Sequence, residues 1–199
     1  MLLCGNCSIL TLCVRCQAES HIQDALRLFR RCVGDAHPLT ANALGHLGQV
    51  LAKQGKKDQA SPFLREALVL EVHKDAFHTA TVFELLSNIK ELHTTAGVDK
   101  DGKPSLKRLH EAYMPYVPSI EHGVVRARGH LQAGDVQRDG DVGALFKISS
   151  EVLLLAGRGD KASPILAEAI TLFERAKQIY DTSTLIQSCR TMAAFAREL

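Results

Sequence analysis

The stretch Val50–Leu70, VLAKQGKKDQASPFLREALVL, occurs a second time in this chain, as VLLLAGRGDKASPILAEAITL at Val152–Leu172. Eleven of the 21 aligned positions are identical, and the second copy begins 102 residues after the first, which is three periods of 34. A fixed period of this length is typical of proteins that stack copies of one small structural unit. The sequence therefore predicts a repeat architecture.

The residues around each copy predict a pair of antiparallel helices joined by a short turn. In the first copy, small and large residues recur at three- and four-residue spacing on both sides of Gly55, at Leu44, Leu47, Gly48, Leu51, Ala60, Leu64 and Ala67. Leaving out Leu47, the equivalent positions of the second copy are Phe146, Ser150, Leu153, Ala162, Leu166 and Ala169. Such spacing places these residues on one helix face, and small residues opposite large ones let two helices pack closely.

This pattern resembles the tetratricopeptide repeat, and its details are similar to the repeats of kinesin light chains. The segments His37-Pro38-Leu39-Thr40-Ala41 and Ala60-Ser61-Pro62-Phe63-Leu64 carry the second resemblance. The resemblance implies an all-α fold, a right-handed superhelical solenoid of about five helix pairs.

We expect one repeat array over residues 1–199. Its clear repeats are 37–72 and 143–178, and its degenerate ones are 4–33, 77–115, 119–133 and 182–199. In 4–33 the spacing predicts a helix pair, with one helix ending near Cys16 and a second over Glu19–Cys32. Residues 134–141 (GDVQRDGD) are rich in turn formers and predict a connection between helices.

The family resemblance also implies a function, because the first helices of such hairpins line a groove that binds peptides or helices of other proteins. By position, the groove residues here are Asn42, Gly45, Gln49, Lys53, Glu84, Asn88, Glu91, Lys147 and Glu151. Gly45 and Gln49 stand where some relatives have the Lys and Asn that hold a C-terminal carboxylate. We therefore expect a non-catalytic scaffold or adaptor with a protein partner and without that carboxylate clamp.

Four cysteines near the N-terminus, Cys4, Cys7, Cys13 and Cys16, have the spacing C-x2-C-x5-C-x2-C. Two pairs of thiolates can hold zinc in tetrahedral coordination, which makes a zinc-stabilised regulatory module one alternative. The intervening Ser-Ile-Leu-Thr-Leu is apolar, however, and Cys13 and Cys16 also fit the face of a helix. We expect the helix, with no metal and no cofactor.

Composition, charge and motif content argue against several classes of function. The chain is 46% hydrophobic and 23% charged with a net charge of +2, so no global charge draws it to nucleic acid or to a membrane surface. No nucleophile, phosphate-loop or dinucleotide motif appears, so we expect neither an enzyme nor a small-molecule substrate. The expected location is the cytoplasm. A structural subunit of a larger assembly is the second alternative.

Overall fold

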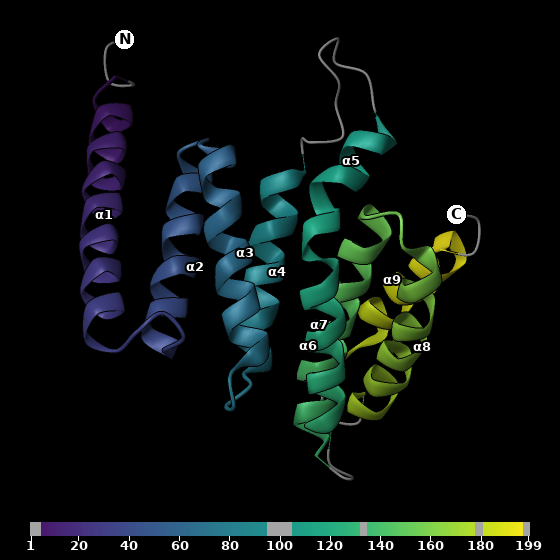
Figure 1. Cartoon of the computed structure of the whole chain (residues 1–199). Coiled ribbons are helices and arrows are strands. Elements are labelled where there is room, and N and C mark those ends of the chain that lie inside the picture. The colour runs from purple at the N-terminus through teal and green to yellow at the C-terminus, as the bar shows by residue number, and fades with distance from the viewer. Residues whose placement is uncertain (1–4, 95–104, 132–134, 178–180, 197–199) are drawn as a thin grey trace. The chain divides into compact units, whose positions relative to one another are not determined.

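The computed structural model describes residues 5–94, 105–131, 135–177 and 181–196, with side chains from residue 17 onward except that of Val136 (Figure 1). These residues form nine α-helices and one 3-10 helix, and no β-strand occurs among them. The fold is therefore all-α and built from tetratricopeptide-type helical hairpins, as the repeat predicts. The chain divides into two compact units, residues 1–74 and 75–199, which we describe in turn.

The first unit contains α1 (Gly5–Cys32), α2 (Pro38–Lys53) and α3 (Lys57–His73). α2 begins after His37, whose Nδ1 accepts a hydrogen bond from the amide of Leu39 at 3.2 Å. Two ion pairs connect α1 to the second hairpin helix and its turn: Lys56 with Glu19 and Arg30 with Glu66, each at 2.7 Å.

The α2–α3 hairpin is closed by the residues that the sequence repeats. Leu44, Ala60, Leu64 and Ala67 are fully buried. A Cβ atom placed on Gly48 would lie 2.6 Å from Cγ of Leu64, so only glycine lets the two helices approach this closely here. The small residues of the repeat are therefore required by packing.

The predicted helix pair in 4–33 is wrong, because α1 is one continuous helix of 28 residues. The residues between the two predicted helices, Gln17 and Ala18, are compatible with a helix, and neither glycine nor proline interrupts them. A turn appears only at Gly34, which has a φ of 91° and follows the end of α1. The apolar spacing in 4–33 is thus that of a single long helix.

The second unit begins with α4 (Thr79–His93), followed by α5 (Leu106–Tyr113), η1 (Met114–Tyr116) and α6 (Val117–Gly129). The last three follow one another directly, with Pro115 in the 3-10 turn and Pro118 in the first turn of α6, where a missing amide hydrogen is tolerated. Phe77, just before α4, stacks on His130, just after α6, with ring centroids 5.4 Å apart. α4 and the α5–η1–α6 rod therefore run antiparallel.

The second copy of the repeat forms the hairpin of α7 (Val136–Leu155) and α8 (Gly159–Ala176). Phe146, Leu153, Ala162, Leu166 and Ala169 are fully buried. These are the equivalents of the α2–α3 core residues, so this hairpin is confirmed as well.

One predicted boundary of this hairpin is wrong. Residues 136–141 are the first turns of α7 and not a connection. The side chain of Asp135 caps the helix by accepting a hydrogen bond from the amide of Arg138 at 3.0 Å, and Asp139 is buried and paired with Arg175 of α8. The cap and the ion pair stabilise helix despite the turn-forming composition.

The last helix, α9 (Ser183–Ala196), packs against α8 and α7. It starts after Thr182, whose hydroxyl donates a hydrogen bond to the carbonyl of Phe173 at 2.8 Å. Ile186 and Cys189 are the buried residues at its centre.

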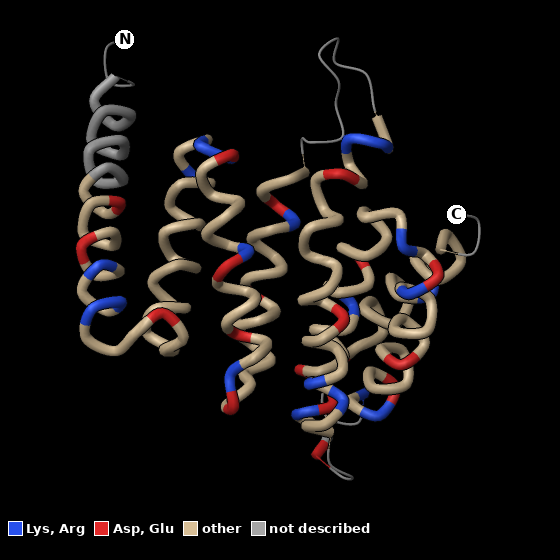
Figure 2. The backbone as a smooth tube through the Cα atoms, in the orientation of Figure 1, with Lys and Arg blue, Asp and Glu red and all other residues tan. Residues whose placement is uncertain are grey.

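Charged residues of both signs are interspersed along the helices of each unit (Figure 2). Many of them form ion pairs, such as the bidentate pair of Arg128 with Glu168 and the pair of Lys161 with Glu121. Over the described ranges, none of the helices has the length and apolar character needed to cross a membrane.

Candidate functional site

A cluster of three charged side chains lies between α4 and α7. The ammonium of Lys90 is 2.5 Å from Oε2 of Glu151, and the ammonium of Lys147 bonds the other carboxylate oxygen, Oε1. The side chain of Glu151 is only 12% exposed, whereas that of Lys90 is 44% exposed. One nearly buried carboxylate is thus shared by two lysines, and the cluster has a net charge of +1.

Burial and the two lysines act on Glu151 in opposite directions. Burial acts to raise the pKa of Glu151, but the hydrogen bonds and charges of Lys147 and Lys90 together outweigh it, so this pKa lies below its ordinary value of 4.5. Glu151 is therefore ionised at neutral pH, and the two ammonium groups share its negative charge.

On one side of the cluster lies a cavity of about 300 Å³, which we call the lysine cavity. Helices α4, α7 and α9 contribute its walls: Phe83, Ser87, Lys90, Ala144, Lys147, Ile148, Glu151 and Leu185. Phe83 and Leu185 are 39% and 37% exposed, so two large apolar side chains stand at its edge. The cavity combines a hydroxyl, two ammonium groups and apolar contact surface.

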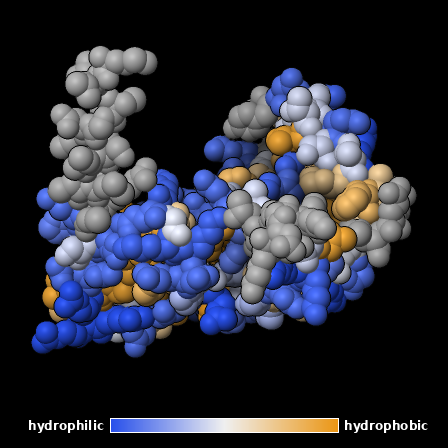
Figure 3. Space-filling view, turned by 90° about the horizontal axis from the view of Figure 1, so that it is seen from above, coloured by the Kyte–Doolittle hydropathy of each residue, from blue (hydrophilic) through white to orange (hydrophobic). Residues whose placement is uncertain are grey.

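On the other side lies a second cavity, of about 320 Å³, which we call the apolar cavity. It lies between α4, α5, α7 and α9, and its lining residues are Lys90, Leu106, Leu109, His110, Glu151, Leu154, Leu155, Met192 and Phe195. Leu106 and Phe195 are more than half exposed. Figure 3, seen from the end where α5 begins and α9 ends, shows hydrophobic side chains on this part of the second unit.

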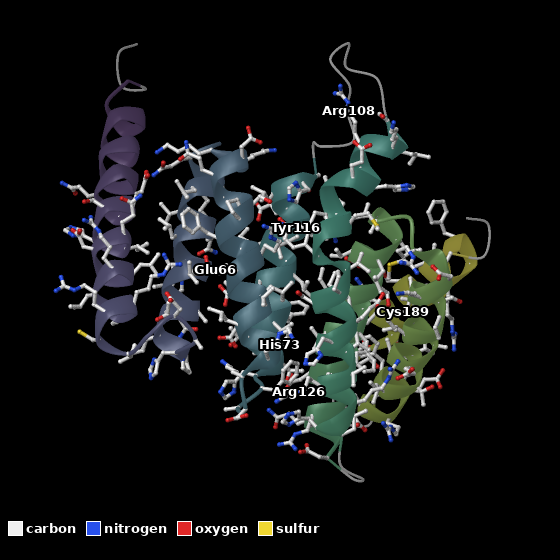
Figure 4. All side chains as sticks on the ribbon, in the orientation of Figure 1. Glu66, His73, Arg108, Tyr116, Arg126 and Cys189 are labelled. Atoms are coloured by element: carbon white, nitrogen blue, oxygen red, sulfur yellow. The ribbon has the colours of Figure 1, made fainter. Side chains whose placement is uncertain are left out.

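Two tyrosines bond the end of α4 to the α5–η1–α6 rod. The hydroxyl of Tyr113 donates to the carbonyl of Lys90 at 2.9 Å, and the hydroxyl of Tyr116 lies 3.0 Å from Nε2 of His93. Burial raises the pKa of Tyr113 to about 12, with a smaller contribution from Tyr116, so Tyr113 remains a donor at neutral pH. Figure 4 shows Tyr116 and Arg126 at separate levels of this rod.

The turn between α7 and α8 packs against a residue that lines the apolar cavity. Gly157, with a φ of 73°, packs directly on His110, and a Cβ atom at this position would lie 2.8 Å from the imidazole ring. His110 itself lines the cavity. The hairpin turn and α5 therefore support each other at this point.

The predicted groove residues of this unit lie in the helices where they were expected, but not all of them face the cavities. Lys147 and Glu151 line the lysine cavity. On α4 the residues that line it are Phe83, Ser87 and Lys90, each one position before the predicted Glu84, Asn88 and Glu91. Helical spacing of three and four residues fits both sets. The sequence alone therefore does not determine which of these two adjacent faces of α4 is turned toward α7.

In the first unit, the predicted residues Asn42, Gly45, Gln49 and Lys53 follow one another at helical spacing along α2. Each of them is at least partly exposed. Their role in binding stays a prediction.

The metal prediction concerns a different part of the chain. Among the side chains that the structure describes, no group of three or more His, Cys, Asp or Glu is placed to hold a metal ion. Cys4, Cys7, Cys13 and Cys16 lie outside the described side chains. Cys189 is fully buried, and burial raises the pKa of its thiol to about 11, so it is not a reactive thiolate at neutral pH.

Comparison with known protein families gives a match in the first unit, outside the two cavities. Residues 17–69 match the family model of the tetratricopeptide repeat. The match covers the second half of α1 together with the α2–α3 hairpin. No curated protein has a sequence that matches the chain significantly. Residues 17–69 are thus similar to a tetratricopeptide repeat, a class of repeat that generally mediates contacts between proteins.

Proposed function

We propose that the protein is a non-catalytic scaffold that binds a peptide segment or a helix of a partner protein on the surface formed by α4, α7 and α9. The observation that carries this proposal is the pair of cavities along α7, joined at the Lys90–Glu151 ion pair. The family resemblance places partner binding on the first helices of successive hairpins, and α4 and α7 are such helices.

The dimensions of this surface suit a short peptide. Its residues on α7 extend from Ala144 to Leu155, which corresponds to about 16 Å at ~1.5 Å per residue. An extended peptide of about five residues, or about three turns of a helix, covers this length. Large apolar side chains of the partner would enter the two cavities, and Ser87 would bond its backbone.

Each contact of this kind contributes modestly, because large apolar residues at the edges of both cavities, such as Phe83 and Leu106, remain partly exposed. The α2 residues Asn42, Gly45, Gln49 and Lys53 provide a second surface of the same kind in the first unit. The likeness of residues 37–72 to kinesin light chain repeats, and a cytoplasmic location, belong to the same proposal.

Peptide selection on the immobilised full chain tests the proposal. We expect a peptide selected from a random library to bind at least about tenfold more weakly to Phe83→Ala, because this exposed ring stands at the lysine cavity. Val125→Ala is the matched control, since Val125 is an exposed apolar residue of α6 that lines neither cavity. Equal loss in both variants, or no loss in Phe83→Ala, would reject this surface as the binding site.

A further inference from the structure

The apolar cavity ends at an ammonium group that can change its partner. Lys90 is 44% exposed and bonds only one oxygen of Glu151, while Lys147 bonds the other. If Lys90 turned toward a new anion, the carboxylate of Glu151 would still be neutralised by Lys147. The exchange therefore leaves no buried charge unpaired. An unpaired buried charge is what usually makes the opening of such an ion pair unfavourable.

The rest of the cavity is suited to an apolar body. Leu106, Leu109, Leu154, Leu155, Met192 and Phe195 make up most of its surface. Its volume of about 320 Å³ falls at the lower end of the range of about 300–1,000 Å³ in which small-molecule sites occur. The thioether of Met192 can adapt to different shapes of ligand.

The charges around Lys90 favour an anion over a cation. Lys90 and Lys147 face a single carboxylate, and among the described residues that line the apolar cavity the remaining titratable side chain is His110. A cationic ligand would meet a cluster that already has a net positive charge. An anionic head group would complete the pairing of both lysines.

We propose that this cavity binds a small organic anion with an apolar body, of which a medium-chain carboxylic acid is the simplest example. Its chain lies against Leu109, Leu154 and Met192, and its carboxylate pairs with Lys90. The volume of about 320 Å³ holds a ligand of this size or one side chain of a peptide. The proposed partner surface includes the same cavity, so this ligand and a partner side chain would compete for it, and each proposal is tested with its own probe.

Calorimetric titration of the full chain at neutral pH with octanoate, octanol and octylamine tests this proposal. We expect octanoate to bind at least about tenfold more tightly than octylamine, with octanol between them. Lys90→Gln should reduce the affinity for octanoate to that for octanol and leave octanol binding unchanged. Lys107→Gln, a change at an 86% exposed lysine of α5, is the control and should alter neither. The melting temperatures of both variants show whether they are folded.

A second readout places the ligand. The methyl resonance of Met192 should shift on addition of octanoate to the wild-type protein. Absence of octanoate binding, or equal affinity for all three probes, would overturn the proposal. It would also be overturned if a selected peptide shifted the Met192 resonance and octanoate did not, since the cavity would then hold a side chain of the partner.

Discussion

Gly55 and Gly157, separated by 102 residues, occupy the same position in two hairpin turns, with φ angles of 80° and 73°. In each turn the amide three residues after the end of the helix makes the same bond, from Lys56 to the carbonyl of Leu51 at 3.0 Å and from Arg158 to that of Leu153 at 2.8 Å. The repeat in the sequence is thus a repeat of backbone conformation. Glycine is required because other residues adopt a positive φ only at a cost.

The two glycines should nevertheless differ in their response to substitution. Gly55→Ala should lower the free energy of unfolding by about 1–2 kcal/mol, because a Cβ at Gly55 meets nothing within 4 Å and only the backbone strain remains. Gly157→Ala adds a clash with His110 and should cost about 1–3 kcal/mol more. Urea unfolding of both variants measures the difference. Equal losses would show that His110 is not held against the turn.

A second prediction concerns the closely packed α2–α3 core. Ala60 is fully buried, so Ala60→Leu should overpack the hairpin and lower the free energy of unfolding by about 1–3 kcal/mol. Gln59→Leu places the same leucine side chain at an exposed neighbouring position and serves as the control. Urea denaturation followed by circular dichroism reports both values. A small effect at Ala60 would contradict the packing described here.

The Lys90–Glu151–Lys147 cluster predicts a defined pH dependence. Because the folded-state pKa of Glu151 lies below 4.5, its ionised form stabilises the fold above pH 4.5, and this contribution is lost as the pH falls through the folded-state pKa. Glu151→Gln should therefore be less stable than the wild type at neutral pH, and the difference should shrink below pH 4.5. Denaturant unfolding over pH 3–7 measures this. Glu111→Gln, at a 65% exposed carboxylate, should show no comparable trend, and a pH-independent difference for Glu151→Gln would argue against the shared carboxylate.

The cysteines give a prediction about reactivity. Cys32 is exposed, whereas Cys189 is buried with its pKa raised to about 11. Iodoacetamide at pH 8 should modify Cys32 readily and Cys189 only after unfolding, as read by peptide mapping in a mass spectrometer. Rapid modification of Cys189 in the folded protein would mean that α9 does not stay packed against α8.

The hairpins could be predicted from the sequence because their determinants are local. The turns are indicated by Gly55 and Gly157, and close helix contacts by the small residues Gly48 and Ala60. Because the pattern recurs after 102 residues, it also indicates which helices pair in each hairpin. The continuity of α1 could not be predicted with the same rules, because its apolar residues satisfy the spacing of one helix or of two. The start of α7 depends on the pairing of Asp139 with Arg175, which are distant in the sequence.

The residues of the candidate site could be predicted from the sequence only in part. Lys147 and Glu151 were found because they lie one turn apart on a helix that the repeat identifies. Lys90 was missed, although it shares a helix face with Phe83 and Ser87, because the rotation of α4 against α7 is set by tertiary packing. The apolar cavity depends on Leu106 and Leu109 of α5, whose position is supported by the bond of Tyr113 to the carbonyl of Lys90.

A methyl chemical-shift map of the full chain with a selected peptide tests most directly whether the partner binds on the surface of α4, α7 and α9. We predict that the largest shifts fall on methyl groups that line the two cavities, namely those of Ile148, Leu154, Leu155, Leu185 and Met192. Methyl groups of Val125 and of the buried Leu166 should remain unshifted. Shifts that leave the cavity residues unaffected and appear elsewhere would contradict the assignment of partner binding to α4, α7 and α9.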